Sequence, residues 1–348
     1  MKGKPIKWLK RNVKATAFNV RSCAATIVRS LDPYASKAFS RSLLVMHAHY
    51  YPNSKIEGNA SEVIRRNLQW LKTHCNVVPL SDGLRCLDRG MTLPSRAVAL
   101  VVDDATSGFA DLGLPVLAET GIPYSLAVIP GFVESGSRDY QMARLMNIGG
   151  HRFQASGITL LEKARNWFRL KESERERFDL NTLFSRARDL SDGSLSELLD
   201  HLEAPHHNMM NWKQLMRLTE TTQAKLVSHT MSHPHLRYAN GAWLEWETSG
   251  AKRAIEIITG EQVDVFVYPY GYPKDAGDLV VNAVRQTGYR YGLLTRKGIT
   301  VGNTCRYRIP RVDAEVPEDR FRQHASTAGW AVLCGTGPVE GDPIQRAR

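Results

Sequence analysis

Residues 97–104 read Ala-Val-Ala-Leu-Val-Val-Asp-Asp, an apolar run that ends abruptly in two carboxylates. A strand that is apolar at every position is typical of a parallel sheet covered on both faces. The run is followed by a helical pattern over residues 109–120, which stops at Gly121, and by a second apolar run over residues 124–129. This alternation of strand, helix and strand predicts an α/β fold built on parallel strands.

The same alternation continues on both sides of this stretch. Short apolar runs predict further strands over residues 43–46, 77–80, 224–227, 263–267 and 291–295. Apolar residues at helical spacing predict amphipathic helices over residues 61–74, 81–87, 211–218, 243–259 and 278–287. We therefore expect an α/β fold of the distorted TIM-like (β/α) barrel type, with about seven parallel strands.

Composition divides the 348 residues into a barrel and its extensions. Residues 42–315 carry the predicted barrel, which is long enough to bury one large core. Within it, residues 135–210 are charged, rich in arginine and helical in pattern, which predicts a helical insertion outside the core sheet. Residues 1–41 form a basic N-terminal extension, and residues 316–348 form a C-terminal tail.

The charge of the chain is strongly positive and concentrated at its beginning. The formal net charge is +11, and six lysines and arginines without any acidic residue fall within residues 1–14. Such a segment attracts nucleic acid, anionic lipid or an acidic polymer. Aromatic residues do not alternate with these charges as single-stranded nucleic acid requires, so we expect no nucleic-acid partner. Residues 5–30 form either an amphipathic helix associated peripherally with an anionic membrane or a plain solvated extension.

The sequence gives no sign of secretion. Arg21 interrupts the only apolar stretch near the start, so the apolar core of a signal peptide is not formed. No run approaches the roughly 18 apolar residues needed to span a bilayer. The five cysteines are scattered and include no CxxC pair, which favours reduced thiols. We expect a cytoplasmic protein, at the inner face of the membrane if the basic extension binds lipid.

Polar residues follow several of the predicted strands directly, and they include two histidines. His229-Thr-Met-Ser-His233 comes after the strand over residues 224–227. Pro234 disfavours helical geometry at His233, so the motif is a loop or a single turn. Two neutral imidazoles suit Zn²⁺ and similar divalent metals. An HxxxH motif taken alone is more often a pair of loop histidines with other hydrogen-bond partners.

Asp103 and Asp104 supply the carboxylates that a catalytic metal site would need in addition to the two histidines. The carboxyl ends of parallel barrel strands meet on one face, so the aspartates and the histidines are expected to converge. One carboxylate would be the third metal ligand, and its neighbour would accept a proton from water. The competing interpretation is that one aspartate caps the helix that begins near Ser107.

Two further segments fall at predicted strand ends. In Tyr268-Pro-Tyr-Gly271, the proline and the glycine fix an unusual backbone path, and the N–H of Tyr270 could face an oxyanion. In Arg308-Ile-Pro-Arg311, an arginine could keep Asp103 ionised and oriented. The alternatives are a turn with two packing tyrosines and a surface arginine.

In this order, the motifs resemble the polysaccharide deacetylase superfamily, the NodB-homology domain of carbohydrate esterase family four. Residues 101–104 (VVDD), 228–234 (SHTMSHP) and 267–271 (VYPYG) resemble the aspartate pair, the HxxxH motif and the RxPY-type segment of that family. The resemblance covers roughly residues 42–315. It implies a metal-dependent hydrolase that removes N-acetyl groups from a carbohydrate containing N-acetylglucosamine.

The resemblance also implies a role for each motif residue. Asp104, His229 and His233 would hold a divalent metal, zinc in most of the family. Asp103 would be the base, and the backbone N–H of Tyr270 would help to hold the oxyanion.

The chain departs from the family pattern at three points. Ala105 stands where the family has glycine after the aspartate pair. The arginine before the Pro-Tyr segment is missing, and Arg308 or Arg311 is the expected replacement. The late Leu-x-His motif, which supplies the general acid, has no clear match, so His47 and His324 both stay candidates. The alternatives to an enzyme are a non-catalytic relative that binds carbohydrate or metal, and a binding protein associated with the membrane surface.

Overall fold

The computed structural model describes residues 40–50, 59–152, 157–315, 320–322 and 325. The basic segment over residues 1–39 and nearly all of the predicted tail lie outside the described residues, and so does His324. The predictions made for them therefore stay predictions. No helix among the described residues is long and apolar enough to cross a membrane.

Six parallel strands form the centre of the sheet, in the spatial order β7-β6-β5-β4-β3-β1. They are β1 (Ser42–Ala48), β3 (Ala97–Val102), β4 (Tyr124–Val128), β5 (Ala224–Ser228), β6 (Val265–Val267) and β7 (Tyr291–Leu293). Three shorter strands pair outside this series: β2 (Asn76–Val77) with β3, β8 (Thr300–Val301) with β1 and β9 (Val312–Asp313) with β1. Of these, β8 runs antiparallel to its partner.

A short segment near the end of the described chain closes the sheet. Ile309 forms a parallel bridge with Leu293 at the end of β7, and β9 pairs with β1 on the other side. The backbone N–H of Ala314 donates to the carbonyl oxygen of His47 at 2.8 Å. The predicted distorted (β/α) barrel is confirmed.

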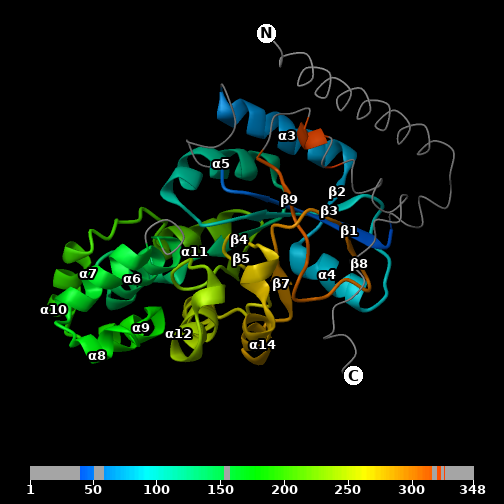
Figure 1. Cartoon of the computed structure of the whole chain (residues 1–348). Helices are drawn as coiled ribbons and strands as arrows, with labels where there is room; N and C mark the ends of the chain where they lie inside the picture. Colours follow the sequence, from blue (N-terminus) through cyan, green and yellow to red (C-terminus); the bar gives the residue numbers. More distant parts are fainter. Residues whose placement is uncertain (1–39, 51–58, 153–156, 316–319, 323–324, 326–348) are drawn as a thin grey trace, which may run out of the picture.

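Two apolar layers explain why β3 is apolar throughout. Its odd-numbered residues belong to the cluster inside the barrel, whereas its even-numbered residues belong to the cluster under the surrounding helices. These helices include α3 (Ala60–His74), α5 (Ser107–Thr120), α11 (Trp212–Thr221) and α14 (Asp278–Gln286), whereas α4 (Leu80–Asp88) packs against the inner cluster. In Figure 1, α3 and α5 lie together along one side of the sheet.

Between β4 and β5 the chain forms a group of helices to one side of the barrel (Figure 1). They are α6 (Arg138–Arg152), α7 (Gly157–Trp167), α8 (Glu172–Arg175), α9 (Leu180–Arg188) and α10 (Asp192–His201). Their cores are leucine-rich, as in Leu195, Leu198 and Leu199, and fully buried. The helical insertion predicted within residues 135–210 is therefore present.

The structure corrects one predicted helix. Residues 243–259 were expected to form a continuous α-helix, but the segment is α12 (Gly241–Glu245), a π-helical turn (Trp246–Gly250) and α13 (Ala251–Thr259). A π-helical turn inserts an extra residue into the helix and changes the direction of the side chains that follow. Here it lies where Glu247 reaches the loop after β5.

Candidate metal centre and active site

The order of the strands brings the predicted motifs together. The loop after β3 carries Asp103 and Asp104, and the loop after β5 carries His229 and His233. The chain after β6 leads into Tyr270. All of these strands are parallel, so the loops lie on the same face of the barrel.

Asp104, His229 and His233 form a compact cluster. One ligand atom from each residue can be chosen so that all three lie within 4.8 Å of one another. Oδ1 of Asp104 lies 3.4 Å from Nε2 of His229 and 3.6 Å from Nε2 of His233. Nδ1 of His229 lies 2.8 Å from the carbonyl oxygen of Val267. A hydrogen bond there places the proton on Nδ1 and leaves Nε2 as the atom facing the cluster.

The environment of Asp104 fits a cation. Its Oδ1 atom is buried and accepts no hydrogen bond from the described residues, which is costly for a carboxylate unless a further partner is present. Burial by itself would raise the pKa of Asp104, but His229, His233 and His49 lower it below its ordinary value. A carboxylate and two imidazoles are a ligand set that divalent zinc accepts. These residues therefore fit a divalent metal ion.

Asp103 is held by Arg311. Nη1 of Arg311 lies 2.8 Å and 3.0 Å from the two carboxylate oxygens of Asp103. The Arg311 side chain is 1% exposed, and its Nε donates to the carbonyl oxygen of Leu294 at 2.9 Å. Burial raises the pKa of Asp103, but Arg311 and the nearby histidines lower it to about 2 overall. Asp103 is thus an ionised carboxylate of fixed orientation beside the cluster.

Arg308 does not reach this carboxylate. Its guanidinium donates to the carbonyl oxygen of Ala276 and forms an ion pair with Asp278 at 2.9 Å. Of the two arginines proposed to replace the missing family arginine, only Arg311 approaches Asp103.

The backbone is in the left-handed region at Tyr270 and Gly271, next to the second histidine, His233. The φ angle of Tyr270 is 60°, and that of Gly271 is 62°. A Cβ atom at Gly271 would lie 2.4 Å from the backbone nitrogen of Thr295, so glycine is needed there. The Tyr270 ring packs edge-on against His233, with ring centroids 4.9 Å apart, and stacks on His235 at 3.8 Å. The segment predicted to face an oxyanion therefore borders the cluster.

The loop between the two histidines is held by a buried glutamate that the sequence did not suggest. Glu247 accepts hydrogen bonds from the backbone N–H groups of Met231 and Ser232 at 2.9 and 3.0 Å. The Ser232 hydroxyl and the Trp243 indole also donate to it. Burial raises the pKa of Glu247 to about 7, although these donors oppose the rise. A carboxylate four residues after a tryptophan in a helical pattern gave no signal of this role.

A further histidine, His49, lies next to the cluster. Its Nε2 is 3.9 Å from Oδ2 of Asp104, and its Nδ1 is 3.4 Å from Oε2 of Glu315. Burial lowers the pKa of His49, but Glu315, Asp104 and Asp103 raise it to about 9 overall. His47, two residues earlier on β1, was a predicted candidate for the general acid, whereas His49 was not predicted. The partner of His49 lies 266 residues away along the chain, which no local pattern reveals.

Comparisons with known proteins agree with this geometry. Residues 201–292 match the family model of polysaccharide deacetylases. No curated protein matches the chain closely enough to count as a relative.

The fold is shared with several solved deacetylases. The deacetylase PplD from Streptococcus pyogenes, solved in complex with acetate, is 15% identical, with 85% of this chain and 99% of that chain covered and a TM-score of 0.53. IcaB from Ammonifex degensii is 16% identical, covering 82% and 96% of the two chains, with a TM-score of 0.52. A de-N-acetylase from Aggregatibacter actinomycetemcomitans is 16% identical, covering 81% and 98%, with a TM-score of 0.51.

The barrel, with its carboxylate and imidazole cluster at the carboxyl ends of the strands, is typical of a hydrolase that works with a bound metal ion. The family match over residues 201–292 specifies the class further and confirms the resemblance seen in the motifs. Over residues 201–292 the chain is thus similar to the polysaccharide deacetylases, which are hydrolases of non-peptide carbon–nitrogen bonds.

Proposed function

We propose that this protein removes N-acetyl groups from an oligosaccharide or polysaccharide that contains N-acetylglucosamine, and that it does so with zinc held by Asp104, His229 and His233. The observation that carries the proposal is the position of the Asp103–Arg311 pair beside that cluster. A divalent cation bound there would polarise the acetyl carbonyl and lower the pKa of water. Three protein ligands leave a coordination position open for this chemistry, as in other catalytic zinc sites.

Asp103 is the group that takes the proton from the attacking water in this proposal. Arg311 holds the carboxylate in place and keeps it ionised, so its oxygens are ready to accept a proton. The backbone N–H of Tyr270 donates to the oxyanion that forms when water attacks the carbonyl carbon. Arg311 acts through Asp103, so it is a positioning residue.

The leaving sugar amine needs a proton, and we assign its delivery to Nε2 of His49. Glu315 contacts both the ring and the backbone N–H of His49, so the ring has a fixed orientation. Its Nε2 atom is the one that faces Asp104 and hence the reacting centre. His47, two residues earlier on β1, and His324, outside the described residues, stay the alternatives.

The test combines metal analysis with turnover on N-acetylglucosamine oligomers. The purified protein should contain about one zinc per chain, and a chelator should abolish acetate release until zinc is restored. His229→Ala should lose both metal and turnover, whereas Asp103→Asn should keep the metal and lose turnover.

Two results would contradict this proposal. Full turnover in Asp103→Asn would remove the assigned base. A protein that binds the metal and the sugar oligomers but releases no acetate would instead be the non-catalytic relative.

A further inference from the structure

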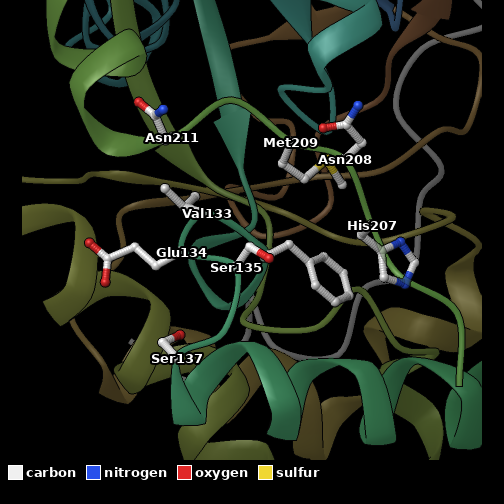
Figure 2. A pocket seen from close by; sticks show the side chains of 9 residues that line it. Val133, Glu134, Ser135, Ser137, His207, Asn208, Met209 and Asn211 are labelled. Atoms are coloured by element: carbon white, nitrogen blue, oxygen red, sulfur yellow. The ribbon is translucent and has the colours of Figure 1, made fainter. Parts of the chain in front are cut away.

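The HxxxH loop (residues 229–233) has a different neighbour on each side. β5 lies between β4 and β6, so this loop runs between the chain that leaves β4 and the chain that leaves β6. After β4 there is a cavity of about 570 Å³, and Figure 2 shows Glu134 and Ser137 on one side of it and His207 and Asn208 on the other. After β6 there is a buried group of titratable side chains that the proposed reaction does not use.

Asp275 is the centre of that group. It lies in a short 3₁₀ helix after β6 (Pro273–Ala276), and its side chain is 0% exposed. Both carboxylate oxygens lie 3.2 Å from Nδ1 of His235, and Nη1 of Arg237 donates to Oδ1 at 3.0 Å. A buried carboxylate needs such donors. An ionised carboxylate can only accept, so the proton of the His235 ring lies on Nδ1.

The two partners of Asp275 belong to the segment directly after the metal ligands. His235 follows His233 by two residues, and Arg237 lies two residues further on. Asp275 itself is tied to the chain after β6, because its backbone N–H donates to the carbonyl oxygen of Tyr272 at 2.8 Å. Asp275 therefore joins the loop after β5 to the chain after β6 through buried side chains.

The ring of His235 packs on Tyr270. The two rings are stacked, with centroids 3.8 Å apart. Tyr270 also meets His233 edge-on at 4.9 Å, and its hydroxyl donates to the carbonyl oxygen of His233 at 3.4 Å. The Tyr270 side chain thus contacts both the second proposed metal ligand and the histidine that Asp275 binds.

These contacts matter because the backbone at Tyr270 is in a conformation that residues other than glycine rarely adopt. The carbonyl oxygen of Tyr270 accepts from the Thr295 hydroxyl, and the N–H of Thr295 donates to the carbonyl oxygen of Gly271 at 2.9 Å. The chain after Tyr270 is therefore held by backbone contacts, and the ring is held by His235. The direction of the Tyr270 N–H depends on both, and a donor that points elsewhere cannot stabilise an oxyanion.

We propose that Asp275 and His235 are positioning residues that keep Tyr270 in the conformation in which its backbone N–H meets the oxyanion. Asp275 fixes the ring of His235, and this ring fixes Tyr270. The inference rests on the proposed function and deepens it, because it adds two residues that act on the reaction through Tyr270. Neither residue transfers a proton in this role.

The two partners of Asp275 allow a matched comparison. His235→Ala removes the contact with Tyr270, and His235→Phe keeps a ring there but loses the hydrogen bond to Asp275. Arg237→Gln weakens the other contact of Asp275 and leaves the stack on Tyr270 in place. For the tetramer of N-acetylglucosamine, we expect kcat to fall about thirtyfold in His235→Ala, less than when an oxyanion donor is removed outright. KM should change by less than about twofold, as for an interaction made only in the transition state.

The other two variants should lie closer to the wild-type protein. His235→Phe should recover part of the lost kcat, and Arg237→Gln should keep nearly all of it. Zinc content should be the same in all of them. Full recovery in His235→Phe would show that the ring needs no hydrogen bond, and it would remove Asp275 from the proposal.

A second measurement does not depend on turnover. Methylphosphonate is a tetrahedral anion with the shape of the intermediate that forms when water attacks an acetyl group. In calorimetry on the zinc-loaded protein, its Kd should rise about tenfold in His235→Ala, the loss of roughly one hydrogen bond to a charged group. The Kd should not change in Arg237→Gln. Urea unfolding of the same variants shows how much stability each one loses.

Two results would overturn the inference. Equal kcat and equal methylphosphonate affinity in His235→Ala and Arg237→Gln would show that the buried group serves only the fold. Loss of zinc from His235→Ala, with kcat restored by excess zinc, would show that His235 acts on His233 and not on Tyr270.

Failure of the proposed function has a different signature. If the wild-type protein releases no acetate from any oligomer, methylphosphonate affinity alone decides the positioning role. A tenfold loss in His235→Ala with none in Arg237→Gln would then support this role. A wild-type protein that neither releases acetate nor binds methylphosphonate would reject it.

Discussion

Nη1 of Arg311 lies 2.8 Å from Oδ1 of Asp103, although 208 residues separate the two in sequence. The contact exists because residues 309–313 pair with β7 on one side and with β1 on the other. The segment that closes the barrel therefore also carries the cation that fixes the proposed base.

Removing this cation should damage both stability and turnover. Arg311→Ala leaves the carboxylate of Asp103 buried without its partner, so the free energy of unfolding should fall by about 3 kcal/mol or more. We expect kcat to fall roughly a hundredfold as the base loses its orientation. Urea unfolding and steady-state kinetics measure the two effects.

A double variant separates the structural effect from the catalytic one. Asp103→Asn combined with Arg311→Met removes both charges and should recover part of the lost stability, but no turnover. Recovery of turnover in the double variant would show that the pair serves the fold alone.

His49→Gln should lower kcat toward N-acetylated sugars by about a hundredfold, because the amine would leave without a donated proton. The metal content should not change. Acetate esters of acidic phenols need no proton on the leaving group, so their hydrolysis should fall far less. His47→Gln, two residues earlier on β1, is the matched variant. Equal losses on both substrates, or a larger loss in His47→Gln, would remove the assignment of His49.

Glu247 should make stability depend on pH. Its pKa is raised from 4.5 to about 7, so the folded state binds this proton more tightly than the unfolded state. The resulting stabilisation is complete below pH 4.5 and is lost as the pH rises through 7, by up to about 3 kcal/mol. Unfolding of Glu247→Gln, measured from pH 4 to 9, should lack this component, and the exposed Glu220→Gln should retain it. Parallel curves for wild type and Glu247→Gln would contradict the assignment.

Gly131, in the loop after β4, donates its N–H to the carbonyl oxygen of Met231 in the HxxxH loop at 3.1 Å, and it should not tolerate a side chain. In Gly131→Ala the new methyl group would collide with the carbonyl oxygen of Met231, so we expect a loss of about 1–3 kcal/mol in stability and reduced zinc affinity. Gly193→Ala is the control, because its Cβ would meet only a Ser191 oxygen at 4.0 Å. Thermal unfolding and zinc titration measure both variants. If Gly131→Ala equals the wild-type protein in both thermal stability and zinc affinity, the close contact between position 131 and Met231 is not needed for either property.

The parts of the fold that local pattern determines were predictable. The strand predicted over residues 97–102 matches β3 at both ends, and the helix predicted over residues 61–74 matches α3 to within one residue. The predicted ends of strands and helices were less accurate where a turn determines them. The strand predicted over residues 77–80 stops at Val77, because α4 already begins at Leu80. The helix predicted over residues 243–259 contains a π-helical turn, which apolar spacing does not reveal.

The candidate site was predictable only where its residues follow strands. Asp104, His229 and His233 come directly after or close to apolar runs, and parallel strands bring such positions together. The sequence did not decide between Arg308 and Arg311 as the partner of Asp103, because residues 309–313 are too short a segment to show how they pair with the neighbouring strands. The position of His49 depends on Glu315, which is a tertiary contact without a sequence signature.

Five residues of the site that are not glycine have positive φ angles: Asp104, Ala105, Thr230, His233 and Tyr270. Each such residue costs of order 1 kcal/mol, which packing in the rest of the barrel must offset. Mutations selected only for resistance to heat would therefore tend to accumulate at the site and to remove these strained backbone conformations. We expect such thermostable descendants to hold the proposed metal ion more weakly than their parent and to be less active.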